Sequence, residues 1–135
     1  MNEDLVRYRL ERSAEALEDA KILLDQKRLH ATVNRLYYSM FYAVVALLET
    51  QDLKSSKHSG VRALFNQHFV KTKSISKESG DFYGVMYTNR QKGDYVEYTE
   101  FTEAHVKGFF TECGLRLDEI RTRINEIMAL CSDEK

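Results

Sequence analysis

The C-terminal third of the chain carries a regular apolar repeat that limits what the sequence can fold into. Apolar or small residues recur at alternating steps of four and three, at Val106, Phe110, Cys113, Leu117, Ile120, Ile124, Ile127 and Cys131. That spacing places their side chains on one face of a long helix, in the pattern of left-handed helix packing. Phe109 and Met128 widen this face. A helix with so long an apolar face needs other helices to cover it.

The composition favours the same architecture for the rest of the chain. The 135 residues include no proline and six glycines, so few positions force a helix to break. The patterns predict helices over about 3–26, 30–51, 57–72 and 78–92, a loop over 93–98, and Thr99 as the cap of the last helix. The predicted fold is one all-α domain over residues 1–135: an antiparallel up-and-down helical bundle of four long helices plus a shorter helix.

Several kinds of site and location are disfavoured by the residues present. Cys113 and Cys131 are 18 residues apart, which on one helix is about 27 Å and too far for a disulfide. No metal-ligand spacing, phosphate-binding glycine loop or catalytic-serine motif occurs, so we expect no cofactor. The N-terminus is too charged for a secretory signal, and no apolar run reaches the roughly 18 residues of a membrane span. We expect a cytoplasmic protein without a membrane partner.

A window of one charge sign lies in the middle of the chain. Residues 53–77 contain six basic residues and no acidic one: Lys54, Lys57, Arg62, Lys71, Lys73 and Lys77. His58 and His68 lie in the same window. Such a window can attract phosphate, and it can equally be a solvated lysine face. The sequence leaves both interpretations open.

The second predicted helix has two unlike faces. Its broad apolar face contains Val33, Tyr37, Met40, Phe41, Val44, Leu47 and Leu48. A second stripe, again with steps of four and three, contains Arg35, Ser39, Tyr42, Ala46 and Glu49. Small residues and polar tips suit a close polar seam, either inside the bundle or between two copies of the chain. We expect Arg35 to be largely buried and paired with a carboxylate from another helix, with Asp94 as first choice.

Three stretches of the chain resemble one known family. The run NRLYYSMF at residues 34–41 resembles the N-R-x-Y-Y-A-x-F helix of the HEPN superfamily (higher eukaryote and prokaryote nucleotide-binding). KHSG at 57–60, followed by Phe65, resembles the K-x-H-s-g…F stretch of its small stand-alone UPF0332-type members. RQKGDY at 90–95 resembles their R-x-x-x-D-Y stretch. The three matches occur in the expected order.

The resemblance implies a bundle that is usually a homodimer, associated with minimal nucleotidyltransferases and with toxin–antitoxin or defence systems. Many HEPN proteins are metal-independent endoribonucleases in which an Arg holds the scissile phosphate and a His, after four to six intervening residues, assists the 2′-hydroxyl. Here Arg35 fits the Arg, but the His position is occupied by Tyr42. Tyrosine has an unperturbed pKa of about 10 and is a poor general base at pH 7. The nearest candidate histidine is His58.

Three functions therefore remain open. The first is a non-enzymatic HEPN module that binds RNA, a nucleotide or a nucleotidyltransferase partner. The second is an endoribonuclease that uses Arg35 with His58 or Tyr42. The third is a purely structural interaction module. The residues expected to bind nucleotide or RNA are Asn34, Tyr38, Lys57, Arg62, Arg90 and Asp94. Arg90 and Asp94 can instead form a structural network with Arg35 or Tyr38.

Overall fold

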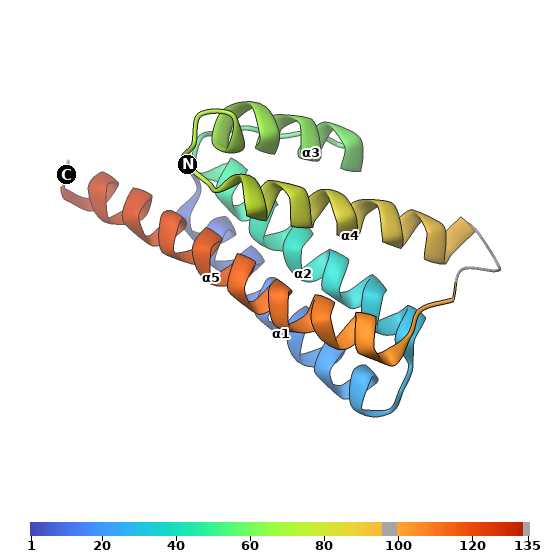
Figure 1. Cartoon of the computed structure of the whole chain (residues 1–135). Coiled ribbons are helices and arrows are strands. Elements are labelled where there is room, and N and C mark those ends of the chain that lie inside the picture. The colour runs from blue at the N-terminus through green and yellow to red at the C-terminus, as the bar shows by residue number, and fades with distance from the viewer. Residues whose placement is uncertain (96–99, 134–135) are drawn as a thin grey trace.

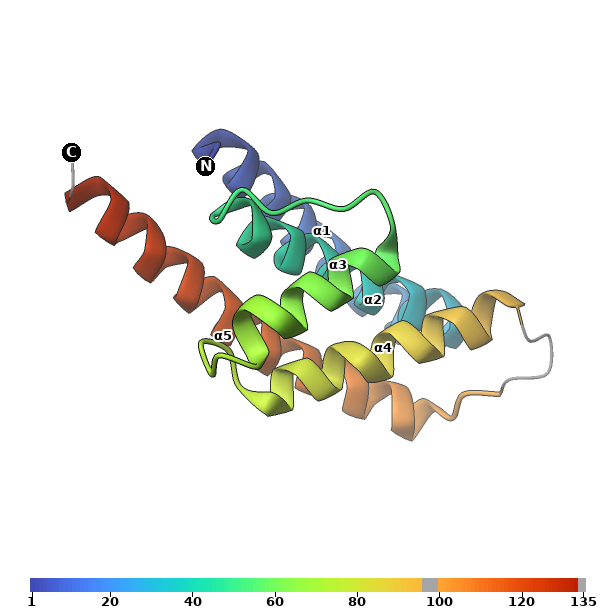
Figure 2. The ribbon, with the colours of Figure 1, turned by 90° about the horizontal axis from the view of Figure 1, so that it is seen from above.

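The computed structural model describes residues 1–95 and 100–133, with the side chains of residues 1–90 and 100–132. Within these ranges the chain forms α-helices and no strand, in the order α1 (Glu3–Asp25), α2 (Leu29–Glu49), α3 (His58–Phe65), the π-helical turn η1 (Asn66–Val70), α4 (Lys77–Tyr95) and α5 (Glu103–Asp133). The four long helices run alternately in opposite directions, and the short α3 lies beside α4 and over α2 (Figures 1 and 2). The predicted all-α bundle is confirmed.

The apolar repeat of α5 forms one wall of the core. Val106, Cys113, Leu117, Ile120, Ile124 and Ile127 are buried, and Phe110 and Cys131 are half-buried at the edge. Burial raises the pKa of the Cys113 thiol to about 12, although a hydrogen bond with Ser39 acts in the opposite direction. Cys113 is therefore a small core residue that stays protonated at neutral pH.

Helix α2 is the central element of the bundle. Twelve of its 21 residues are buried, and α1, α4 and α5 surround it (Figure 1). Small residues permit the close approach of α1, where Ser13, Ala16 and Ala20 are buried. The Ser13 hydroxyl donates to the Ser39 carbonyl oxygen at 2.7 Å, and the Ser39 hydroxyl lies 3.2 Å from the Cys113 sulfur. The polar stripe predicted on this helix thus lies partly inside the bundle.

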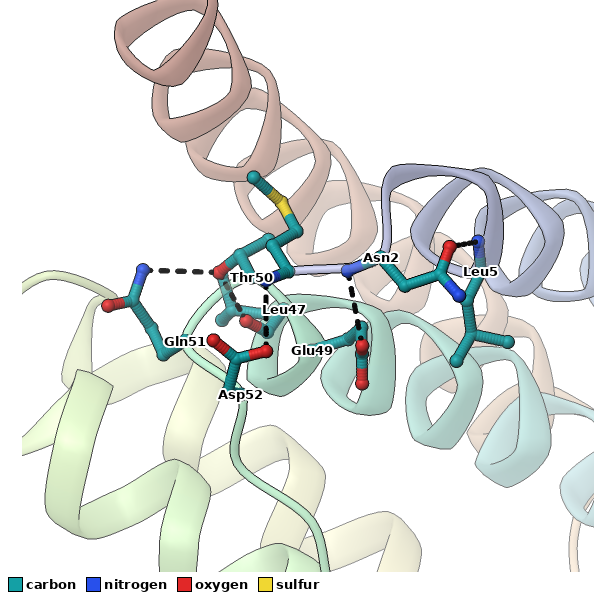
Figure 3. A network of polar contacts seen from close by, with 8 residues as sticks. Asn2, Leu5, Leu47, Glu49, Thr50, Gln51 and Asp52 are labelled. Atoms are coloured by element: carbon teal, nitrogen blue, oxygen red, sulfur yellow. Dashed lines mark hydrogen bonds and ion pairs between the residues drawn. The ribbon is translucent and has the colours of Figure 1, made fainter. Parts of the chain in front are cut away.

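Polar contacts fix the start of α1 to the end of α2 (Figure 3). The backbone N–H of Asn2 donates to Glu49 at 3.3 Å, and the Met1 amino group lies 2.9 Å from an Asp52 carboxylate oxygen. The Asn2 side chain also caps α1, because its oxygen accepts the N–H of Leu5 at 3.1 Å. Glu49 is only 4% exposed, so the last member of the predicted stripe is buried too.

Three predicted helix boundaries need correction. The helix predicted over 57–72 ends at Phe65 and continues as η1, where a bond from the Lys71 N–H to the Asn66 carbonyl closes a wider turn. The helix predicted to end at residue 92 reaches Tyr95, since one glycine inside a helix costs only about 1 kcal/mol. Helix α5 begins at Glu103, where the Thr102 hydroxyl accepts the His105 N–H; Thr99 lies outside the described residues.

A carboxylate of α5 holds the first turn of α4. Glu119 accepts hydrogen bonds from the Ser76 N–H at 2.7 Å, the Ser76 hydroxyl at 2.6 Å and the Ser79 hydroxyl at 2.5 Å. Partial burial raises the pKa of Glu119, but the bonds from Ser76 and Ser79 outweigh it, so that the net shift is downward. Glu119 therefore stabilises the fold in its charged form and joins α5 to α4.

We expect Glu119→Gln to lower the free energy of unfolding at pH 7 by about 1–2 kcal/mol, because an amide offers one acceptor oxygen to these donors. Because folding lowers the pKa of Glu119, the charged carboxylate stabilises the folded protein at pH values above its pKa in the unfolded chain. This stabilisation is lost as the pH falls through the pKa of Glu119 in the folded protein. The difference between variant and wild type should therefore shrink below about pH 4. Urea unfolding at both pH values measures it, with Glu126→Gln on the exposed face of α5 as control. Equal stability of the Glu119 variant and wild type at pH 7 would contradict the capping role.

Candidate functional site

One strip of α2 stays half-open from Ala31 to Val45. It contains Ala31, Arg35, Tyr38, Tyr42 and Val45, which recur at steps of four and three; Ala31 is exposed and the others are half-buried. Fourteen residues separate its ends, which is about 21 Å along the helix axis. Two hollows open beside this strip, one towards α4 and one towards α1.

The first hollow, here named the α2–α4 cleft, has a volume of about 320 Å³. It lies at the start of α2 and the later part of α4, and it is lined by Leu23, His30, Ala31, Val33, Asn34, Arg35, Asn89 and Arg90. Its polar groups are amides, a histidine and two guanidinium groups, and these lining residues include no carboxylate. The chemistry of the cleft therefore favours an anionic ligand.

Arg35 occupies this cleft in a way the sequence did not predict. Its side chain is half-buried, and its Nη2 and Nε atoms donate to the Asn34 side-chain oxygen at 2.9 and 3.3 Å. The guanidinium also lies over the Tyr38 ring, 5.0 Å from the centroid. The half-buried Arg35 meets the Asn34 amide and the Tyr38 ring among the described side chains, where a carboxylate was expected. The side chain of Asp94, its predicted partner, lies outside the described residues.

Arg90 reaches the same tyrosine from α4. Its Nη2 lies 3.4 Å from the Tyr38 hydroxyl oxygen, and its guanidinium carbon is 5.6 Å from the Tyr38 centroid and 5.1 Å from the Tyr37 centroid. Tyr38 therefore contacts two guanidinium groups from different helices. Stacking on aromatic faces orients arginine heads, so Arg35, Tyr38 and Arg90 form one unit at the edge of the cleft.

His58 lies close to this unit, at the first residue of α3. Its Nδ1 is 2.7 Å from the Tyr37 hydroxyl oxygen, and its ring stacks on Phe41 with the centroids 4.4 Å apart. Burial lowers the pKa of His58, and the charge of Arg90 lowers it further, so the imidazole is neutral at pH 7. Burial also raises the pKa of Tyr37 to about 12, which keeps its hydroxyl protonated. A neutral imidazole beside an arginine can accept a proton.

Tyr42, which occupies the position of the family histidine, belongs to the other hollow. The guanidinium of Arg12 lies over its ring, 5.5 Å from the centroid. Tyr42 and Arg35 are on the same strip of α2, as their spacing predicts, yet the hollows they line are different. The structure therefore places His58, and not Tyr42, near an arginine of the α2–α4 cleft.

The basic window does not form a single surface site. Lys57 is exposed in front of α3, and Lys54, Lys71, Lys73 and Lys77 are exposed as well. Arg62 instead packs against α4, with its guanidinium 5.2 Å from the Tyr87 centroid. Gly84 makes room for it, because a Cβ at this position would lie 2.6 Å from the Arg62 Nη2 atom. Neither Lys57 nor Arg62 lines the α2–α4 cleft.

Two residues of the cleft were missed by the sequence interpretation. His30 looks like a surface residue at a helix start, and it is exposed, but it lines the cleft and packs edge-on to Phe101. Asn89 precedes Arg90 and lines the cleft as well. Its position beside Arg90 is the only feature of the sequence that indicates a place in the cleft. A helical pattern does not predict which neighbour of an arginine lines the same cleft.

Two structural features are absent from the part of the chain that the structure describes. No three or more His, Cys, Asp or Glu side chains there come together as metal ligands. No described helix combines the length and the apolar character needed to cross a bilayer.

The chain is similar to known proteins over most of its length. The family profile of the HEPN domain matches residues 6–124. A UPF0332 protein of Thermotoga maritima is 46% identical over 125 residues, which cover 93% of this chain and 95% of that protein. The Methanocaldococcus jannaschii protein named "Putative toxin MJ0605" is 31% identical over 131 residues, covering 95% of this chain and 97% of that protein. The resemblance inferred from the three stretches is confirmed.

We expect Arg35→Ala to lower the free energy of unfolding by less than about 1 kcal/mol, since the variant loses a half-exposed stacking contact and an amide bond. A buried ion pair would instead cost about 3–5 kcal/mol when one partner is removed. Denaturant unfolding of wild type and Arg35→Ala measures the difference. A loss in the larger range would show that Arg35 holds the bundle together after all.

We expect the pKa of His58 to lie below that of a free histidine, and Arg90→Gln to move it upward by removing a nearby positive charge. The imidazole proton signals in an NMR pH titration report this value for each histidine. Lys71→Gln, which removes an exposed charge, is the matched control. An unchanged midpoint for His58 in Arg90→Gln would mean that the two groups do not interact.

Proposed function

The chain belongs to the HEPN family, and we propose that it is an RNA-binding HEPN module of a toxin system. The toxin context is supported by two relatives of Methanocaldococcus jannaschii that carry the word toxin in their names. The α2–α4 cleft is the proposed RNA contact. Its lining joins two arginines to amide side chains, and both kinds of group hydrogen-bond to phosphate and sugar oxygens.

The observation that carries this proposal is the unit of Arg35, Tyr38 and Arg90. Two guanidinium groups lie within 6 Å of the same tyrosine ring, at 5.0 and 5.6 Å from its centroid. Arginine forks recognise phosphates, and tyrosine rings stack on bases. The unit therefore offers one flexible strand both a backbone contact and a base contact, which suits unpaired RNA.

A homodimer and a minimal nucleotidyltransferase partner remain proposals that derive from the family resemblance. The fold limits where either could engage α2, because α1, α4 and α5 already surround this helix. The half-open strip from Ala31 to Val45 is the part of α2 left for another molecule. A second copy that packs on this strip would bring its own Arg35 near the first.

RNA cleavage is the second candidate function, and the state of His58 favours it. The imidazole is neutral at pH 7 and lies near Arg90. In the tautomer whose Nδ1–H donates to the Tyr37 hydroxyl oxygen, Nε2 carries the lone pair that can receive a proton from a ribose 2′-hydroxyl. Arg90 or Arg35 would hold the phosphate at which negative charge develops. No step of this reaction requires a metal.

We expect the protein to bind a single-stranded oligoribonucleotide with an affinity that falls steeply as salt rises. Arg35→Gln and Arg90→Gln should each weaken binding about tenfold, the effect of losing roughly 1.4 kcal/mol of contact energy. The Lys71→Gln/Lys73→Gln double variant removes two exposed charges away from the cleft and should change affinity far less. Fluorescence anisotropy at two salt concentrations measures all of these affinities.

Folded arginine variants that bind as tightly as wild type would remove the α2–α4 cleft from the RNA site. A larger loss in the lysine variant would place the contact on the turn between η1 and α4 instead. A cleavage assay with the same oligonucleotide distinguishes the RNA-binding module from the endoribonuclease. Cleavage that His58→Gln abolishes while binding persists would establish the enzyme in place of the simple binding module.

A further inference from the structure

His58 and two buried tyrosines form a row of polar groups beside the α2–α4 cleft. The Tyr37 hydroxyl oxygen lies 2.7 Å from Nδ1 of His58. The rings of Tyr37 and Tyr83 are nearly parallel, with 6.0 Å between their centroids and 10° between their planes. Both tyrosine side chains are 0% exposed, so solvent does not reach their hydroxyl groups. Each hydroxyl hydrogen therefore needs an acceptor inside the protein.

The Tyr83 hydroxyl has the fewest possible acceptors. Among the described residues it makes no hydrogen bond of good geometry. A weaker contact with the Tyr37 hydroxyl remains, and this contact acts to lower the pKa of Tyr37 against the larger effect of burial. A neighbour that donates to a phenol oxygen has this effect, because it stabilises the phenolate. We therefore assign the Tyr83 hydrogen to the Tyr37 oxygen.

This assignment determines where His58 carries its proton. Since the Tyr37 oxygen accepts from Tyr83, the Tyr37 hydrogen is directed to Nδ1 of His58, and a nitrogen that accepts carries no proton. The imidazole is neutral at pH 7, because burial lowers its pKa and the charge of Arg90 lowers it further. The single proton of the neutral ring then lies on Nε2.

The opposite tautomer leaves a buried donor without an acceptor. If Nδ1 carried the proton and donated to the Tyr37 oxygen, the Tyr37 hydrogen would have to turn towards Tyr83. The Tyr83 hydrogen would then meet no acceptor in the part of the chain that the structure describes. A buried donor that loses its hydration without a new partner is costly, so this arrangement is disfavoured. Proton transfer to Nε2, as RNA cleavage would require, depends on this disfavoured tautomer.

Aromatic contacts hold the His58 ring in the orientation that the Tyr37 bond requires. The ring stacks on Phe41, with 4.4 Å between the centroids and 17° between the planes, and it meets Tyr38 edge-on at 5.9 Å. A half-turn of the ring would put a carbon atom against the Tyr37 hydroxyl, which would lose its acceptor. No described residue is bonded to Nε2, so its N–H is open to a ligand.

We propose that Tyr37 is a positioning residue that holds His58 as the Nε2–H tautomer, so that the imidazole donates a hydrogen bond to RNA and does not take a proton from it. The acceptor is a phosphate or sugar oxygen, since both accept N–H donors and the charge of Arg90 favours an anion nearby. The ligand rests on the RNA-binding function proposed above, whereas the tautomer does not. Of the two candidate functions, this tautomer favours the binding module.

Proton–nitrogen NMR correlation of the isotope-labelled full chain at pH 7, without ligand, tests the tautomer, because protonated and unprotonated imidazole nitrogens differ widely in chemical shift. The His58 signals are identified by their loss in His58→Gln. We expect a protonated Nε2 and an unprotonated Nδ1 in the wild type. Tyr37→Phe should shift the Nδ1 signal and increase the share of the Nδ1–H tautomer, because the donor to Nδ1 is lost. Tyr38→Phe keeps the edge-on ring and should change neither.

A wild type with its proton on Nδ1, or unchanged nitrogen shifts in Tyr37→Phe, would overturn the proposal. The wild-type spectrum decides the tautomer even where Tyr37→Phe does not fold.

Fluorescence anisotropy with a single-stranded oligoribonucleotide tests the contact with RNA. His58→Phe keeps a ring on Phe41 but has no N–H, and we expect it to bind about fivefold more weakly than wild type. His58→Gln keeps an N–H donor and should bind within about twofold of wild type. Equal binding of folded His58→Phe and wild type, or RNA cleavage that His58→Gln abolishes, would overturn the donor role. A wild type that holds Nε2–H but does not bind the oligonucleotide would support the positioning role of Tyr37 and contradict the RNA function.

Discussion

The close contact between α1 and α2 is the constraint on which the rest of the structure depends. Small side chains on both helices let the backbones approach, and the Ser13 hydroxyl bonded to the Ser39 carbonyl fixes their register. Because α4 and α5 enclose α2 on its other sides, a single strip of this helix remains half-open. The α2–α4 cleft and the second hollow, lined by Tyr42, both open beside that strip. The packing of the core thus decides where polar chemistry can occur.

Tyrosine rings organise the positive charge along this strip. Arg35 and Arg90 lie against Tyr38, and Arg12 lies against Tyr42. The guanidinium groups also make hydrogen bonds beside these rings, since Arg35 donates to the Asn34 amide and Arg90 to the Tyr38 hydroxyl. Among the described side chains, the half-buried Arg35 contacts a ring and an amide and no carboxylate. The two rings thus fix where three guanidinium groups lie along the strip.

The fold could be read from the sequence because its signals are local and periodic. The α5 repeat defines its buried face, and the absence of proline leaves the helices uninterrupted. The site could be read only in part. Arg35 and Tyr42 were placed correctly on one strip, but their surroundings depend on α1 and α4, which no spacing within α2 reveals. The amide partner Asn34 depends on a side-chain rotamer, and η1 depends on how Phe65 and Phe69 both reach the core.

The contact between Arg62 and Gly84 has a consequence for how the sequence can vary. The Arg62 guanidinium occupies the space that any larger residue at position 84 would need. A substitution at position 62 or 84 therefore changes which residues fit at the other position. We expect the two positions to covary among relatives. Because the guanidinium is the far end of a flexible side chain, a larger residue at position 84 would turn Arg62 away from its contact with Tyr87. A glycine on α4 thereby restricts the evolutionary freedom of an arginine on α3.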